Sequence, residues 1–227
     1  MTAEMKPFPP LWAVIPIKET RQAKQRLAGL LSPVERQKFA QAMIEDVLDA
    51  LADVPELAGV VVVTVDPAVI EFARRRGMTV TGRGAYDGHT GAVTVTAREF
   101  AAKGCAVLTM PADIPLVTAR DIRAVIAARK AAPSFTIVPA RDFQGSNAVI
   151  LSPADAVPLR FGDNSFYPHL AAAEAAGITP NVVRCASIEL DIDTPDDLDA
   201  FQAVPSDTRA AKLVARLLRA HLVQGAS

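Results

Sequence analysis

Three aspartates follow apolar stretches that have the length of strands, and their positions suggest a bound cation. Asp113 lies between two prolines directly after the apolar run of residues 105–110, while Asp191 and Asp193 follow the run that begins at residue 181. Two residues apart at a strand end, Asp191 and Asp193 would point to the same side, which is costly unless a cation or a proton lies between them. Because Mg²⁺ takes one or two carboxylates together with substrate phosphates, all three are candidate magnesium ligands. An ordinary loop carboxylate at Asp113 and a helix cap at Asp193 are the alternatives.

A basic segment after the first apolar run offers the complementary charge. Lys18, Lys24 and Arg26 lie within the stretch that directly follows the strand expected at residues 11–17. Cations at this place would neutralise a triphosphate and the charge that develops on leaving pyrophosphate, which makes these three residues the catalytic candidates. The segment has neither the Walker nor the Rossmann glycine pattern. A solvated basic loop explains the same residues equally well.

A glycine-rich segment, residues 81–93, leads into a helix and is a candidate nucleotide-binding loop. It holds four glycines, and its backbone N–H groups at Gly88, His89 and Thr90 could approach a nucleobase or a phosphate. A flexible surface turn explains the glycines equally well.

Small polar residues at two further places suit an anion. Ser146 immediately precedes an expected strand, and Gly162 and Ser165 stand where a helix begins. A β-turn explains Ser146, and a simple cap by Asn164 or Ser165 is the favoured interpretation of the helix start. The histidines give no Ser-His-Asp or Cys-His arrangement; His169 lies on the expected helix beside this turn.

The elements that must position these residues alternate between strand and helix from end to end. Such alternation predicts an α/β fold with a mostly parallel twisted sheet flanked by helices, in a single domain of residues 1–227 with its core at about 11–203. A helix at 205–223 would either pack back on the core or pair with a second subunit. In such sheets ligands bind outside the carboxyl ends of the strands, so the candidate residues should meet at one edge. The expected strands are 11–17, 59–65, 78–80, 105–110, 134–140, 147–152 and 181–190, and the expected helices are 32–51, 66–77, 96–104, 118–132, 165–177, 194–204 and 210–223.

Composition narrows the class of protein. Lys and Arg number 24 against 25 Asp and Glu, which argues against a nucleic-acid binder with a broad basic surface. Cys105 and Cys185 both lie in apolar stretches and indicate buried thiols in a reducing compartment. No apolar run approaches about 18 residues, so we expect a cytoplasmic protein without membrane contact.

Several segments together resemble the 2-phospho-L-lactate and phosphoenolpyruvate guanylyltransferase family (CofC, also called FbiD) of coenzyme F-420 biosynthesis. The resemblance runs in order from about Trp12 to Phe201. The segments are "VIPIKETRQAKQRLAGLLSPVERQKFAQAMIEDVL", "PADIPL", "GSNAVIL", "FGDNSFYPHLAAAEAAGI" and "LDIDTPDDL".

The resemblance implies transfer of GMP from GTP to a phosphorylated three-carbon acid, with release of pyrophosphate. The acid would be phosphoenolpyruvate, 2-phospho-L-lactate or 3-phosphoglycerate, and the fold that of nucleotide-diphospho-sugar transferases and molybdopterin nucleotidyltransferases. The family motifs imply Mg²⁺ on Asp113 and Asp191, the triphosphate side on Lys18, Lys24 and Arg26, and the acceptor on Ser146, Gly162 and Ser165. We expect the nucleotide at Gly88, His89, Thr90 and Asp113, and Asp193 remains the next candidate for the metal.

Two departures from the family pattern concern the substrates. Ser146 stands in "GSN" where the family commonly has "GTN", and "GHTGA" at residues 88–92 replaces the usual "GLNAA". If the missing Asn helps to select guanine, the base preference of this chain differs from that of the family. Two alternatives to this function stay open: a related nucleotidyltransferase that acts on a molybdopterin or sugar phosphate, and a catalytically inactive nucleotide-binding module.

Overall fold

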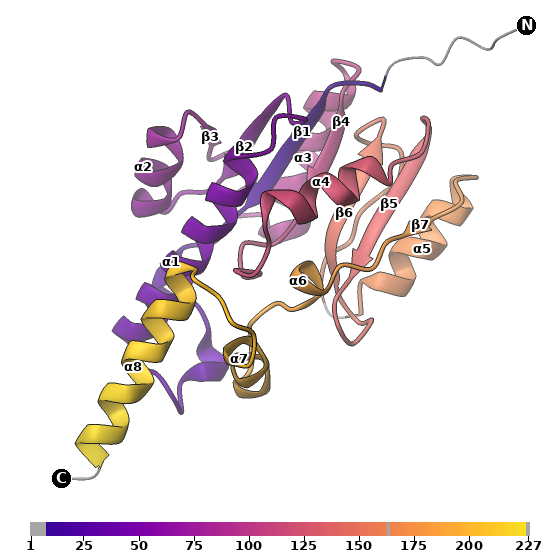
Figure 1. The fold of residues 1–227 in the computed structure, drawn as a ribbon. Coiled ribbons are helices and arrows are strands. Elements are labelled where there is room, and N and C mark those ends of the chain that lie inside the picture. Colours follow the sequence, from indigo (N-terminus) through magenta and orange to yellow (C-terminus); the bar gives the residue numbers. More distant parts are fainter. Residues whose placement is uncertain (1–7, 163, 226–227) are drawn as a thin grey trace, which may run out of the picture.

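A computed structural model describes residues 8–162 and 164–225 of the chain (Figure 1). The described residues contain one seven-stranded sheet with the strand order β3-β2-β1-β4-β6-β5-β7. The strands are β1 (Leu11–Pro16), β2 (Gly59–Val63), β3 (Thr79–Thr81), β4 (Ala106–Thr109), β5 (Ser134–Pro139), β6 (Ser146–Ser152) and β7 (Asn181–Val182). The helices are α1 (Pro33–Ala52), α2 (Pro67–Arg75), α3 (Gly88–Ala101), α4 (Ala119–Ala127), α5 (Phe166–Ala175), α6 (Ala186–Glu189), α7 (Pro195–Gln202) and α8 (Arg209–Gly225), with 3₁₀ turns η1 (Thr20–Gln22) and η2 (Gln25–Leu27).

The carboxyl ends of β1, β2 and β4 lie at the same edge of the sheet, because these strands are parallel. β1 pairs in parallel with β2 and β4, and β2 with β3, as the sequence predicts. β6 is antiparallel to both β4 and β5. Because β6 runs the opposite way, its first residue, Ser146, lies at the edge where β1, β2 and β4 end.

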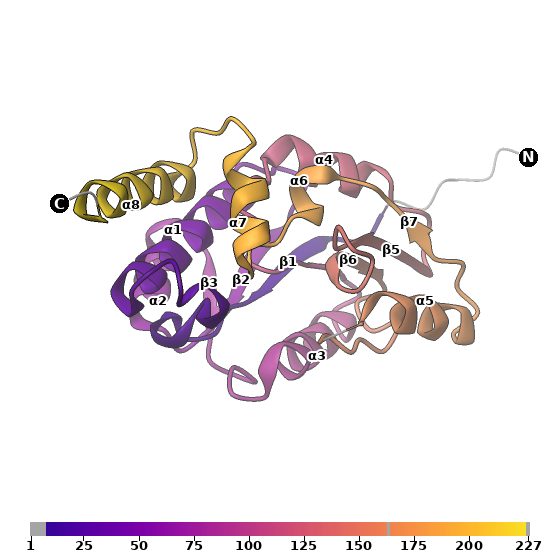
Figure 2. The same ribbon diagram turned by 90° about the horizontal axis from the view of Figure 1, so that it is seen from below.

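Helices cover both faces of the sheet, which explains why its central strands β1 and β2 are apolar throughout. Figure 2 shows α1 and α4 on one side of the sheet and α3 and α5 on the other. Alternate residues of one strand serve the two layers: Ala13 of β1 belongs to the apolar cluster that contains residues of α1 and α4, and Val14 belongs to the cluster that contains residues of α3. The strand therefore needs apolar side chains at every position.

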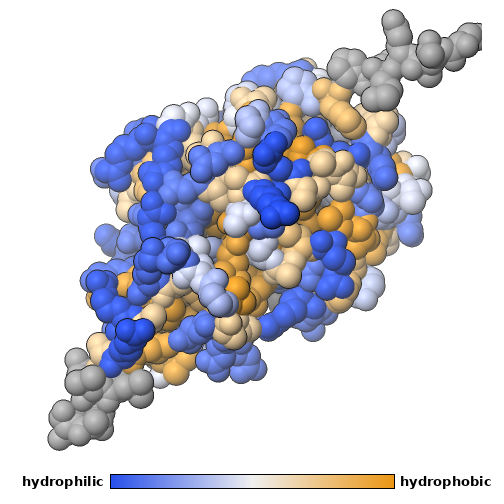
Figure 3. All heavy atoms as spheres, in the orientation of Figure 1, coloured by the Kyte–Doolittle hydropathy of each residue, from blue (hydrophilic) through white to orange (hydrophobic). Residues whose placement is uncertain are grey.

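The α2 helix borders solvent beside the edge strand β3. It buries Val69 and Phe72, while Arg74 and Arg75 are exposed. Figure 3 shows hydrophilic residues gathered over this side of the molecule. This helix is thus amphipathic, with one apolar face against the sheet.

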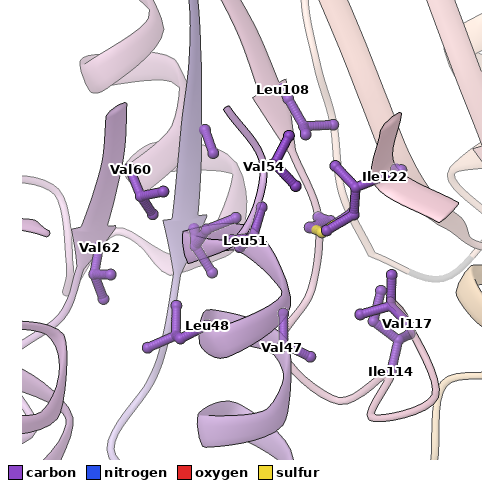
Figure 4. Close-up of a cluster of buried hydrophobic side chains, with 14 of the residues drawn as sticks. Val47, Leu48, Leu51, Val54, Val60, Val62, Leu108, Ile114, Val117 and Ile122 are labelled. Atoms are coloured by element: carbon purple, nitrogen blue, oxygen red, sulfur yellow. The ribbon is translucent and has the colours of Figure 1, made fainter. Parts of the chain in front are cut away.

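The α1 helix is fixed at its start by a capping box and along its length by one apolar face. The Ser32 side chain accepts a hydrogen bond from the Glu35 N–H, and the Glu35 carboxylate accepts one from the Ser32 N–H, as the sequence predicts. Val47, Leu48 and Leu51 point toward the sheet, where they meet side chains of β2 and β4 (Figure 4).

The α8 helix packs back along α1 (Figure 1). Both carboxylate oxygens of Asp46 in α1 accept hydrogen bonds at the start of α8, one from the Arg209 N–H at 3.0 Å and one from the Ala210 N–H at 2.9 Å. Ala210 and Val214 are buried in a cluster with Phe39 of α1. Of the two arrangements that the sequence allows for this helix, packing on the core is the one observed, and a homodimer stays a prediction.

Two expected elements are wrong. The strand predicted at 181–190 consists only of the two-residue β7, and the chain then turns into the short helix α6. The loop predicted over residues 81–93 ends early, because α3 begins at Gly88 and not near residue 96. Across the described residues, no helix has the length and apolarity required to cross a membrane.

Candidate active site

A cavity of about 1040 Å³ lies at the edge where β1, β2 and β4 end. The basic segment after β1, the start of α3 and the loop after β4 form its walls. Of the candidate residues, those in its lining are Lys18, Lys24, Gly88, His89, Asp113 and Asp193. The remaining candidates lie outside this lining: Arg26, Thr90, Ser146, Gly162, Ser165 and Asp191.

Lys24 joins two of the predicted metal ligands. Its Nζ donates to Asp113 Oδ2 at 2.7 Å and to Asp193 Oδ1 at 2.8 Å, and its side chain is only 7% exposed. Burial lowers the Lys24 pKa, but the two carboxylates outweigh it and hold the pKa above its ordinary value. Lys24 has φ 56° and ψ 44°, the left-handed region that non-glycine residues seldom adopt. The backbone therefore holds an unfavourable conformation at the residue that bridges both carboxylates.

Asp66 anchors the basic segment to the rest of the fold. Its Oδ2 accepts hydrogen bonds from the Thr20 N–H and from Thr20 Oγ1, both at 2.8 Å, and its Oδ1 caps α2 through the Ala68 N–H at 3.0 Å. Burial raises the Asp66 pKa, but the hydrogen bonds from Thr20 and α2 outweigh it and hold the pKa below its ordinary value. Asp66 thus fixes the backbone that carries Lys18 and Lys24.

Replacing Asp66 by Asn should lower the free energy of unfolding by about 1–2 kcal/mol at neutral pH, because hydrogen bonds to a charged acceptor are lost. Since the folded pKa of Asp66 is depressed, its contribution is present above the unfolded pKa of about 3.9 and is lost as the pH falls below it. Urea unfolding at pH 7 and near pH 3 should show the difference between wild type and variant shrinking in acid. A difference that is the same at both pH values would contradict the role of the carboxylate; the exposed Asp155→Asn serves as control.

Asp191 is held by a residue that lies outside the regular ladder of β6. Val138 pairs with Ala148 and Pro139 with Ser146, so Asn147 is an extra residue, a β-bulge. The buried Asn147 donates through Nδ2 to Asp191 Oδ1 at 2.9 Å. Burial is the main cause that raises the Asp191 pKa, and the neighbouring charges of Asp113 and Asp193 raise it further.

Asp191 and Asp193 lie close to Asp113 although the strand expected to carry them, at 181–190, is formed only as the two-residue β7. The Ile192 N–H donates to the main-chain oxygen of Asp113 at 3.0 Å, which ties the segment after α6 to the loop after β4. Thr194, with Asp197, forms the capping box of α7, so Asp193 is not needed as the cap and pairs with Lys24 instead. Burial raises the Asp193 pKa, but Lys24 and, more weakly, Arg26 outweigh it and lower the pKa.

The carboxylates fit a magnesium ion that shares its ligands with a substrate. Within the described ranges no three Asp, Glu, His or Cys side chains are grouped to hold a metal ion. Mg²⁺ needs only one or two carboxylates when phosphates and waters supply the rest. Asp113 Oδ1 is buried without a hydrogen-bond partner among the described residues, and Asp191 is near enough for the two charges to repel. A cation between Asp113 and Asp191 would give Asp113 Oδ1 a partner and would relieve the repulsion between the two carboxylates.

The predicted acceptor residues Ser146 and Ser165 come together. Ser165 Oγ donates to Ser146 Oγ at 3.2 Å, and both side chains are buried. Ser165 occupies the N-cap position of α5, but neither its side chain nor that of Asn164 makes a capping hydrogen bond in the described part of the chain. The favoured interpretation of this helix start as a simple cap is therefore wrong. Gly162 is exposed in the same turn and has φ 138°, which a side chain would disfavour.

The departures from the family pattern, His89 and Thr90, both contact the turn before α5. Thr90 Oγ1 accepts from the Phe161 N–H at 2.9 Å, and the His89 ring lies 4.2 Å from the Phe161 ring. His89 Nε2 is buried and has no hydrogen-bond partner among the described residues. Burial is the main cause that lowers the His89 pKa, to about 4, so its imidazole is neutral at the cavity wall.

Sequence reasoning missed the parts played by Asn147 and His169. Asn147 lies in the quoted "GSN" stretch, but only a bulge directs its side chain to Asp191. His169 lies four residues after Ser165, one helical turn, and its Nδ1 is 2.9 Å from Ser146 Oγ. The spacing between Ser165 and His169 was the available signal.

Comparison with known proteins gives consistent matches. A family model described as "Guanylyl transferase CofC like" matches residues 11–221. A phosphoenolpyruvate guanylyltransferase of Rubrobacter xylanophilus is 36% identical over 194 residues, covering 85% of this chain and 94% of the relative. One of Roseiflexus castenholzii is 36% identical over 209 residues, covering 92% and 95%. A 2-phospho-L-lactate guanylyltransferase of Methanothermobacter thermautotrophicus is 32% identical over 205 residues, covering 90% of each chain.

Solved structures support the fold. A Desulfovibrio desulfuricans protein assigned as a nucleotide-diphospho-sugar transferase superposes with a TM-score of 0.74 at 16% identity, covering 92% of this chain and 96% of that one. A nucleotidyl transferase from Methanothermobacter gives a TM-score of 0.59 at 18% identity, covering 86% and 96%. The predicted α/β fold, similar to nucleotide-diphospho-sugar transferases, is confirmed.

Proposed function

This chain belongs to the CofC-like guanylyl transferase family, and we propose that it transfers GMP from GTP to a small phosphorylated three-carbon acid, with release of pyrophosphate. The acceptor would be phosphoenolpyruvate, 2-phospho-L-lactate or 3-phosphoglycerate, and the reaction would serve coenzyme F-420 biosynthesis. The observation that carries the proposal is the meeting of Lys24, Asp113 and Asp193 in one cavity at the edge of the sheet.

In this reaction an oxygen of the acceptor's phosphate attacks the α-phosphorus of GTP. The new bond joins that oxygen to the α-phosphorus, the bond from the α-phosphorus to the bridging oxygen of the β-phosphate breaks, and pyrophosphate leaves with the electron pair. The acceptor phosphate is already ionised at neutral pH, so no protein residue needs to remove a proton. The contribution of the protein is then to position the two substrates and to balance their charge.

The cavity walls supply the groups for that task. Lys18 is exposed in the cavity and is free to approach the triphosphate, while Lys24 is held between two carboxylates. Arg26 lies outside the cavity lining and would act on the leaving pyrophosphate only at longer range. Gly88, His89 and Thr90 begin α3, whose N-terminal N–H groups favour anionic or polar groups of the nucleotide.

Mg²⁺, when bound by Asp113 and Asp191, would supply positive charge against the phosphates of the nucleotide. Asn147 orients Asp191 for this role through its hydrogen bond to Oδ1. Lys24 holds Asp113 through Oδ2 and leaves Oδ1 without a partner among the described residues.

Pairing each of GTP, ATP, CTP and UTP with each of the three acids, with Mg²⁺ present, tests the proposal through pyrophosphate release. We expect release with GTP and at least one acid. Absence of release from every pair would overturn the proposal. Preference for another nucleotide would show that His89 and Thr90, in place of the family's Leu and Asn, have changed the base selected.

A further inference from the structure

The His169 imidazole is held in one tautomer by a main-chain contact. Its Nε2 lies 2.9 Å from the Arg160 nitrogen, and His169 is only 1% exposed. A main-chain N–H can only donate, so Nε2 must be the acceptor and carries no proton. Burial lowers the His169 pKa to about 4, which keeps the ring neutral at physiological pH. The one ring proton of His169 therefore lies on Nδ1.

That proton determines how the two serine hydroxyls beside it can bond. Nδ1 lies 2.9 Å from Ser146 Oγ, so Nδ1–H donates to Ser146, whose Oγ is also 3.2 Å from Ser165 Oγ. The three side chains carry three hydrogen-bonding protons, namely His169 Nδ1–H and the two serine O–H groups, but only two hydrogen bonds join them. One hydroxyl proton is thus left over, on Ser146 or on Ser165. With the opposite tautomer, Ser146 would donate to Nδ1, Ser165 would donate to Ser146, and no proton would remain.

We propose that His169 is a positioning residue: the Arg160 N–H fixes its Nδ1–H form, so that the Ser146–Ser165 pair keeps one hydroxyl proton for an anionic oxygen of the acceptor. This inference rests on the proposed function, because it takes the acceptor acid as the ligand of that pair. A hydroxyl proton left without a partner in a buried pair costs free energy, and a carboxylate or phosphate oxygen would recover that cost.

The surrounding backbone supports an anion at this place. The bulge at Asn147 puts Ser146 on the face of the sheet covered by α5, next to Ser165 at the start of that helix. Ser165 directs its side chain to Ser146 and not to the first turn of α5. In that turn the Phe166 N–H donates to the main-chain oxygen of Gln144 at 3.0 Å and Pro168 has no N–H, so the turn offers an anion no more than the Tyr167 N–H beside the free hydroxyl.

The tautomer can be measured without turnover. In protein labelled with ¹⁵N-histidine, long-range proton–nitrogen correlation spectra distinguish a protonated from an unprotonated ring nitrogen, and His169→Asn identifies the His169 signals. We expect Nδ1 protonated and Nε2 unprotonated at pH 7. The reverse pattern, or a charged ring, would overturn the inference whether or not the protein is an enzyme.

Kinetics then test whether the tautomer serves the acceptor. His169→Phe should raise the acceptor KM by about 10-fold, the effect of losing one hydrogen bond to a charged group, with the GTP KM changed by less than about twofold. His169→Asn, which keeps an N–H donor near the place of Nδ1, should restore most of the loss. Adding His169→Phe to Ser146→Ala should raise the acceptor KM no further, because the effect of His169 passes through Ser146.

A merely structural role would give a different result. It would lower Tm and affect both substrates, and the effects of His169→Phe and Ser146→Ala would add; either outcome would overturn the inference. His221→Phe, which removes a histidine of α8, is the control and should leave both KM values unchanged. If the wild type shows the Nδ1–H tautomer but no transfer to any acid, the proposed function fails together with the acceptor's role; transfer by a wild type with the Nε2–H tautomer would overturn only this inference.

Discussion

Replacing Asp113 by Asn should lower kcat by about a thousandfold, the scale of loss found when a charge-stabilising group is removed from an active site. The amide keeps the shape of the side chain but removes the negative charge that faces Lys24 at 2.7 Å and that would hold Mg²⁺ through Oδ1. The measurement is pyrophosphate release under saturating substrates, together with Tm.

The matched control is Asp155→Asn. Asp155 is exposed and follows β6, whose carboxyl end lies at the edge of the sheet opposite the cavity, so this variant should keep wild-type turnover. Full turnover in Asp113→Asn would contradict the assignment of the site. A wild type that binds GTP but turns over no acid would instead indicate the inactive nucleotide-binding module.

Replacing Lys24 by Met should lower kcat by about a hundredfold and make the fold dependent on cations. Without the ammonium group, Asp113 and Asp193 repel each other, and the Asp193 pKa, which Lys24 now holds down, should rise. Because Mg²⁺ can take the place of the lost charge, adding it should raise Tm of Lys24→Met more than Tm of the wild type.

Two further variants separate charge from backbone strain. Lys24→Gly removes the same side chain but is at ease with φ 56°, so it should be more stable than Lys24→Met and equally impaired in turnover. Lys130→Met, an exposed lysine after α4, should leave both Tm and turnover unchanged. If Lys24→Met kept full turnover, Lys24 would be a structural residue and no part of the reaction site.

The sequence predicts correctly those features that depend on local pattern. Continuous apolar runs predict the central parallel strands, and the Ser32 and Thr118 capping boxes are read directly from neighbouring residues. The place of Asp113 can also be predicted in this way, because ligands of α/β sheets bind at the carboxyl ends of the strands and Asp113 closely follows a central strand.

Other features depend on individual side-chain and backbone contacts, which the spacing of apolar residues in the sequence does not predict. The apolar run at 181–190 favours a strand, yet the Cys185 N–H donates to Glu189 Oε1 at 2.8 Å and Arg184 pairs with the same carboxylate, which closes the turn of α6. The glycines of 81–93 favour a loop, but a Cβ at Gly91 would collide with that of Asp87, the residue before α3, so this glycine serves close packing at the start of the helix and not flexibility.

The bulge at Asn147 is the most consequential of the unpredicted features. Alternation along a regular strand would have sent Ser146 and Asn147 to the opposite faces from those they occupy. The extra residue instead directs Asn147 to Asp191, a proposed metal ligand, and places Ser146, a proposed acceptor residue, against His169. Only the pairing of β5 with β6 reveals it.

The most direct test of the central claim is ³¹P NMR of the wild-type reaction with GTP, Mg²⁺ and the acid that gives pyrophosphate release. The expected result is a pair of coupled signals from a new diphosphate bridge between GMP and the acid, appearing one for one with pyrophosphate and absent with Asp113→Asn. Pyrophosphate that appears with free GMP, or GDP that appears with orthophosphate, would contradict transfer of GMP to the acid.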